Sequence, residues 1–136
     1  MARERSSRRL VASDIVFIWS LRHKHLPHQP MNRQCREVLG IRREGERGRL
    51  EIVFRSGPNH AVGDGCYSGQ VGVVNGVWLN LHMPGVVRAL LDEAIEGGWN
   101  TREPTLLRLD GWGLIDAVAG KLEDHAGVDT RRLQAI

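Results

Sequence analysis

The chain has 136 residues, the length of a single domain, and 41% of them are hydrophobic while 26% are charged. This balance is ordinary for a soluble globular protein, and no apolar run reaches the roughly 20 residues that a membrane-spanning helix needs. Two cysteines, Cys35 and Cys66, are too few for a disulfide scaffold, so we expect two reduced thiols. Spacing alone leaves one bridge between them open.

The formal charge of +3 is unevenly distributed along the chain. Residues 1–49 hold 12 Lys and Arg against 5 Asp and Glu, whereas residues 50–136 hold 7 against 11. Seventeen of the 19 basic residues are arginines, whose forked guanidinium suits phosphate and carboxylate groups, although a GC-rich genome gives the same bias without function. The basic half therefore offers a candidate nucleic-acid-binding set: Arg3, Arg5, Arg8, Arg9, Arg22 and Lys24, with Arg33 and Arg36 as further cations able to neutralise phosphates. No recognised nucleic-acid-binding module accompanies it, so weak, nonspecific contact is expected.

Residues 1–9 lack apolar periodicity, and we expect them to form a disordered basic arm. An apolar run over 10–21 follows and outlines a short export signal. Asp14 interrupts that run, and no small-residue cleavage site precedes Arg22, so a cytoplasmic location is expected. The β-branched and aromatic residues from Ile15 to Trp19 favour a strand, with a buried first helix as the alternative.

The next segments predict a second hairpin. Residues 34–43 favour a strand, 44–48 have turn chemistry, and 50–54 alternate apolar with other side chains in the manner of a strand with one buried face. A glycine-containing loop follows over 56–69.

Residues 70–81 predict a hairpin around Asn75-Gly76, a pair that suits a two-residue type I′ turn. That turn pairs Val73 with Trp78 and Val71 with Asn80. Apolar side chains then lie on both faces near the turn. We therefore expect self-association, most simply as a dimer, through this hairpin.

A helix is expected from about Pro84 to Glu96, since proline suits a first helical turn and Gly97-Gly98 suit its end. A strand over 105–110 and a helix over 114–122 follow, and 125–136 reads as a polar tail. These elements predict an α+β fold, with an antiparallel sheet of about four to six strands and two C-terminal helices packed on one face. One domain then spans 10–124.

One segment, residues 80–99, resembles small bacterial proteins. The shared pattern is Asn-Leu-His-x-Pro-Gly-x-Val-Arg-Ala-Leu-Leu-Asp-Glu-Ala over 80–94, closed by Gly98-Trp99. No activity is attached to that group, so the resemblance implies no catalytic residue. Some such chains are encoded near toxin or mobile-element genes.

Two groups of residues are candidate sites. His60, Asp64, Cys66 and His82 form a candidate ligand-binding set, because the hairpin should return position 82 to the vicinity of Gly69. His23, His25 and His28, with Cys35, have metal-binding side chains. Their spacing matches no usual zinc pattern, and Arg22 and Lys24 would repel a cation, so we expect a solvated histidine loop, with no metal and no cofactor.

The absence of a catalytic signature favours a non-enzymatic binding or interaction protein, for example an accessory factor of a toxin or mobile element. Two alternatives stay open. One is nucleic-acid binding through the basic half, and the other is a small-ligand binder or enzyme that uses the set around His82.

Overall fold

The computed structural model describes residues 7–25 and 35–126. Within these ranges the chain forms eight strands, two α-helices and two short 3₁₀ turns. The strands are β1 (Arg8–Ala12), β2 (Ile15–His25), β3 (Cys35–Arg43), β4 (Arg49–Arg55), β5 (His60–Val62), β6 (Gln70–Val73), β7 (Trp78–Asn80) and β8 (Leu106–Asp110). The helices are α1 (Pro84–Glu96) and α2 (Ile115–Ala126), and the 3₁₀ turns are η1 (Gly65–Tyr67) and η2 (Gly111–Gly113).

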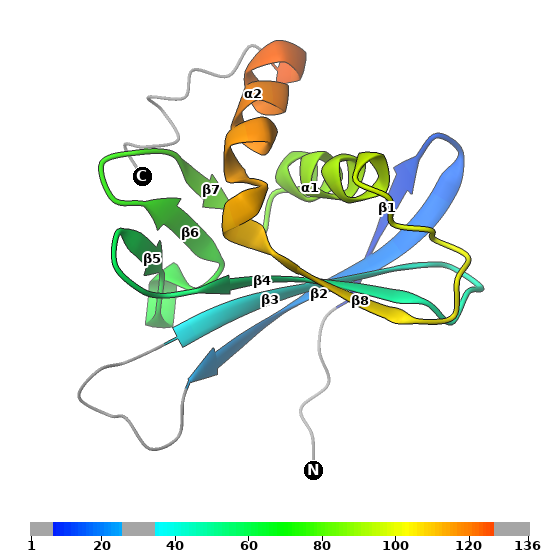
Figure 1. Ribbon diagram of the computed structural model, residues 1–136, viewed down its shortest axis with the longest axis horizontal. Helices are drawn as coiled ribbons and strands as arrows, with labels where there is room; N and C mark the ends of the chain where they lie inside the picture. The colour runs from blue at the N-terminus through cyan, green and yellow to red at the C-terminus, as the bar shows by residue number, and fades with distance from the viewer. Residues whose placement is uncertain (1–6, 26–34, 127–136) are drawn as a thin grey trace.

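Five strands form the main sheet in the order β1-β2-β3-β4-β8, and every pair is antiparallel except β4 with β8. In Figure 1 this sheet is seen nearly edge-on, with α1 and α2 on one side of it. The α+β class, with two C-terminal helices on one sheet face, is therefore confirmed. The strands β5, β6 and β7 form a second, three-stranded sheet, which the sequence pattern did not distinguish from the main sheet.

The core fills the space between the main sheet and the helices. Side chains that alternate along β2, β3 and β4 point to this side, and Phe17, Leu39 and Ile52 are almost completely buried there. Helix α1 presents Val87 and Leu90 to the same cluster. Burial of such side chains is the main favourable contribution to folding, at about 1.5–3 kcal/mol each.

The structure corrects the hairpin register by one residue. Val71 pairs with Leu79 and Gly72 with Trp78. This register results because Val73, whose N–H donates to the Val77 carbonyl, and Val77 enclose a three-residue loop rather than a two-residue type I′ turn. The reason is conformational, since positive φ is found at Asn75 alone of the central Asn-Gly pair.

The corrected register places the apolar hairpin residues Val71, Leu79 and Leu81 together in the core. Trp78 covers Gly72 on the other face, and Val74 is exposed at the turn. Dimerisation through 70–81 stays a prediction.

Three boundaries differ from the sequence-based expectation. β1 begins at Arg8, so Arg8 and Arg9 belong to the sheet rather than to a basic arm. β5 lies in what was expected to be a loop, and α2 extends to Ala126. Residues 1–6, 26–34 and 127–136, which include most of the expected arm and tail, lie outside the described ranges. Neither α1 nor α2 has the length and apolar character needed to cross a bilayer.

Candidate functional site

The face of the main sheet opposite the helices is covered by no described helix or strand (Figure 1). We call it the open face. Its side chains alternate with those of the core, and on β2, β3, β4 and β8 they include seven cations. These are Arg22, Lys24, Arg36, Arg42, Arg49, Arg55 and Arg108. The same four strands place only two carboxylates on this face, Glu51 and Asp110.

Three of the cations form a row across neighbouring strands. Lys24 on β2 pairs in register with Arg36 on β3, which pairs with Arg55 on β4. No ion pair joins any of the three to a carboxylate among the described residues. Like charges directly opposite each other destabilise a sheet. The positive potential is strong enough to lower the pKa of Lys24, chiefly through the charge of Arg22.

A buried carboxylate organises the neighbouring arginines. Glu51 is 6% exposed, and its two oxygens lie 2.9 Å from Arg22 Nη2 and 2.9 Å from Arg108 Nε, with Arg49 Nη2 at 3.4 Å. The hydrogen bond from Arg108 is the main reason that the pKa of Glu51 lies below its ordinary value. One carboxylate thus fixes three guanidinium groups and neutralises a single charge.

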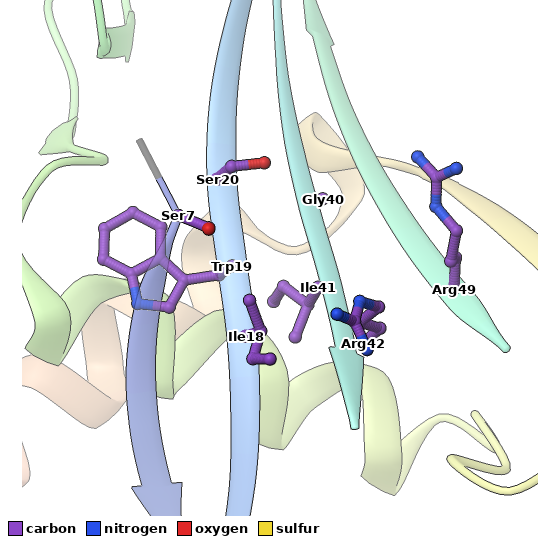
Figure 2. A pocket seen from close by; sticks show the side chains of 8 residues that line it. All are labelled: Ser7, Ile18, Trp19, Ser20, Gly40, Ile41, Arg42 and Arg49. Carbon is purple, nitrogen blue, oxygen red and sulfur yellow. The ribbon is translucent and has the colours of Figure 1, made fainter. Parts of the chain in front are cut away.

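A shallow hollow of about 230 Å³ adjoins this network. Figure 2 shows its floor, where Ser20 and Gly40 lie side by side on β2 and β3, with Arg42 and Arg49 beside them. The hollow exists because Gly40 has no side chain, and a Cβ added there would meet nothing within 4 Å.

A larger pocket of about 430 Å³ lies at the end of β4 and β8, next to the cationic row. Arg55, Arg108 and Asp110 line it together with two stacked rings, His60 and Trp112, whose centroids are 4.3 Å apart at an interplanar angle of 6°. Trp112 is held in place because its Nε1 donates a hydrogen bond of 2.9 Å to the Arg55 carbonyl. The pocket therefore combines cations with a fixed aromatic wall.

The predicted nucleic-acid-binding residues are only partly on the open face. Arg22 and Lys24 lie there, and so does Arg9, the register partner of Ile18, which pairs with Glu44. Arg8 points to the other face, where it sits over the Trp19 ring and donates to the His82 carbonyl. Arg3 and Arg5 lie outside the described residues. The sequence reasoning missed Arg42, Arg49, Arg55 and Arg108 as members of the set, although cations alternate with apolar residues along these strands.

The candidate ligand-binding set around His82 does not come together as one site. His60 stacks on Trp112, Cys66 is exposed, and Asp64 lies beside His23 and His25. The expected return of the chain is confirmed, since Leu81 N donates to Gly69 O. His82 Nε2 then lies 3.0 Å from the Ser68 carbonyl rather than beside another candidate.

A different group converges at the end of the β2–β3 hairpin. The ligand atoms of His23, His25, Cys35 and Asp64 all lie within 4.8 Å of one another. Two of the predicted histidines and Cys35 are thus brought together, while His28 lies outside the described residues. Cys35 and Cys66 form no disulfide with each other.

No family model, curated protein or solved structure matches this chain.

Proposed function

We propose that this is a non-enzymatic nucleic-acid-binding protein that holds a single strand across the open face of its main sheet. The phosphates contact the row formed by Lys24, Arg36 and Arg55 and the neighbouring arginines. A base enters the pocket beside the His60–Trp112 stack. Proteins that bind single strands commonly combine a cationic track for the backbone with aromatic rings on which bases stack.

The observation that carries this proposal is the row of three like charges. A sheet that places Lys24, Arg36 and Arg55 opposite one another gives up stability unless an anion binds there. Six of the seven cations of the open face are arginines, whose fork matches phosphate oxygens in pairs.

The shape of the face favours a single strand over a duplex. Within residues 7–25 and 35–126, no helix projects from the open face to enter a major groove, which is the usual way of reading duplex DNA. The rings of His60 and Trp112 offer a stacking surface, which only an unpaired base can use. A cytoplasmic location is part of the proposal, because single-stranded nucleic acid is available there and the two thiols stay reduced. The accessory role beside a toxin or mobile element rests on the 80–99 resemblance alone.

Fluorescence anisotropy with a labelled 20-nucleotide oligo(dT) or oligo(U) tests the proposal. The association constant should fall with the salt concentration, and the exponent of this dependence is about 0.7 for each phosphate contacted. The double variant Arg36→Gln, Arg55→Gln removes two contacts, so its salt exponent should fall by about 1.4 and its affinity at 50 mM salt by about 50-fold.

The matched control is Arg47→Gln, Arg102→Gln, which removes the same charge from exposed positions outside the open-face strands. Its affinity should stay within about threefold of the parent. Equal losses in the two double variants would show that net charge alone drives binding. No binding at 50 mM salt, or a preference for poly-glutamate over the oligonucleotide, would also overturn the proposal.

A further inference from the structure

Four potential metal ligands meet at the end of β2 and β3, on the core side of the main sheet. His23 and His25 are two residues apart on β2, so both side chains point to the same face. Cys35 is the register partner of His25 across the hairpin. Asp64 comes from the loop between β5 and η1, and its carboxylate also accepts a hydrogen bond from Gly65 N.

The four ligand atoms lie within 4.8 Å of one another, and three of the contacts between these side chains are close to the spacing of a tetrahedral site. His23 Nε2 and His25 Nε2 lie 3.2 Å and 3.4 Å from Asp64 Oδ1, and His25 Nδ1 lies 3.4 Å from Cys35 Sγ. Around zinc, with bonds of about 2.0–2.3 Å, neighbouring tetrahedral ligand atoms are roughly 3.3–3.7 Å apart.

A buried glutamate supplies independent support. Glu37 is 2% exposed, and its Oε1 lies 2.8 Å from His23 Nδ1 while accepting a hydrogen bond from Gly69 N. A neutral His23 that donates from Nδ1 to this carboxylate has the lone pair of its Nε2 directed at the cluster. Ligating histidines in metalloproteins are generally oriented in this way by a second carboxylate.

His23 Nε2 is itself buried and has no hydrogen-bond partner. Its 3.2 Å approach to Asp64 Oδ1 satisfies the distance of an ion pair but not the geometry of a hydrogen bond. A buried polar atom without a partner is unfavourable by about the full desolvation of that atom. A metal ion at the centre of the cluster satisfies it.

The donor set selects the class of metal. Two imidazoles, one thiolate and one carboxylate suit zinc, whereas magnesium and calcium take oxygen ligands. The positive charges of Arg22 and Lys24, which argued against a metal on sequence grounds, belong to the open face. Strand alternation places them on the opposite side of the sheet from the histidines.

We propose that His23 Nε2, one ring nitrogen of His25, Cys35 Sγ and Asp64 bind one Zn²⁺ ion. Binding releases the thiol proton of Cys35 to solvent, and the thiolate forms the Zn–S bond. Four protein ligands make this a closed, structural site rather than a catalytic one. The ion joins the loop before η1 to the end of the β2–β3 hairpin, and Glu37 is its positioning residue.

The test uses the full chain, without a histidine tag, and measures zinc content together with the absorption of the Co²⁺-loaded protein. The expected result is one zinc per chain and a thiolate-to-cobalt charge-transfer band. Cys35→Ser should remove the band and weaken zinc binding at least 100-fold in competition with a chromophoric chelator. Cys66→Ser, which changes the exposed cysteine, should leave both unchanged.

Two further variants separate ligation from folding. His25→Gln alters a side chain that is 53% exposed, so the core stays intact while the affinity for zinc falls at least tenfold. Glu37→Gln should lower the affinity about 10- to 100-fold and retain the cobalt charge-transfer band, because the thiolate is unchanged. His82→Gln is the matched control for the histidine and should bind zinc like the parent.

The proposal is overturned if the parent binds no zinc at micromolar concentration. It is also overturned if Cys35→Ser and Cys66→Ser lose zinc equally, or if stoichiometric zinc survives both Cys35→Ser and His25→Gln. None of these results bears on the oligonucleotide titration, so this inference and the proposed function fail or succeed separately.

Discussion

Replacing Glu51 with glutamine should weaken the fold and strengthen nucleic-acid binding at the same time. Glu51 is the buried acceptor for Arg22 and Arg108, and glutamine keeps its shape but removes its charge. Breaking a buried ion pair by removing one partner is unfavourable by about 3–5 kcal/mol. Arg49 and Arg108 are more than half exposed, so solvent screens part of this term. We therefore expect a loss of about 2–3 kcal/mol of unfolding free energy.

The gain in binding follows from Coulomb's law. A carboxylate about 10 Å from a bound phosphate repels it by about 0.4 kcal/mol in water. Removing that repulsion from two or three phosphates, with partial screening by salt, predicts affinity about two- to fivefold tighter. Urea unfolding and oligonucleotide anisotropy on the same preparation measure the two effects. Glu103→Gln, at an exposed position outside the sheet, should change neither.

The pH dependence has a definite sign. The pKa of Glu51 is lower in the folded protein than its ordinary value of 4.5. Its contribution is therefore fully present above about pH 4.5 and is lost as the pH falls through the folded-state pKa. The stability difference between the parent and Glu51→Gln should shrink below pH 4.5. A difference that stays constant down to pH 3, or a weaker affinity for oligonucleotide at pH 7, would refute this reasoning.

Two further predictions concern β3 and the loop between β3 and β4. Arg36→Thr removes the centre of the like-charge row, so urea unfolding should show that the variant is about 0.2–1 kcal/mol more stable than the parent. Its affinity for the oligonucleotide should fall. A loss of stability would contradict the role assigned to the row. Gly48→Ala would place a Cβ 2.0 Å from the Glu103 carbonyl oxygen and should destabilise by at least about 2 kcal/mol. Gly40→Ala meets open space and should be neutral or slightly stabilising, and equal losses in the two glycine variants would count against the packing described.

The local patterns of the sequence predict most of the individual elements. Alternation identifies β4, and the proline and paired glycines bracket α1 at Pro84 and Gly97. The predicted hairpin register is wrong because the Asn-Gly pair fits more than one turn geometry. The choice between these geometries depends on burying Val71 with the core. β5 has three residues, too few for any periodicity to be detected.

The two sites depend on pairings that only the fold supplies. The like-charge row requires the register of three strands, although each strand shows its cation in sequence. The His23-x-His25 spacing predicts one shared face if the segment is a strand, but the nearby prolines favoured a loop. Asp64 approaches these histidines through tertiary packing, and no spacing between 25 and 64 indicates it.

Titration of the ¹⁵N-labelled protein with oligo(dT), followed by backbone amide shifts, tests most directly where the strand binds. We predict shifts concentrated in β2, β3, β4 and β8, largest near Lys24, Arg36 and Arg55, with little change in α1. Shifts confined to the helices, or none at low salt, would contradict the assignment of the open face as the nucleic-acid-binding surface.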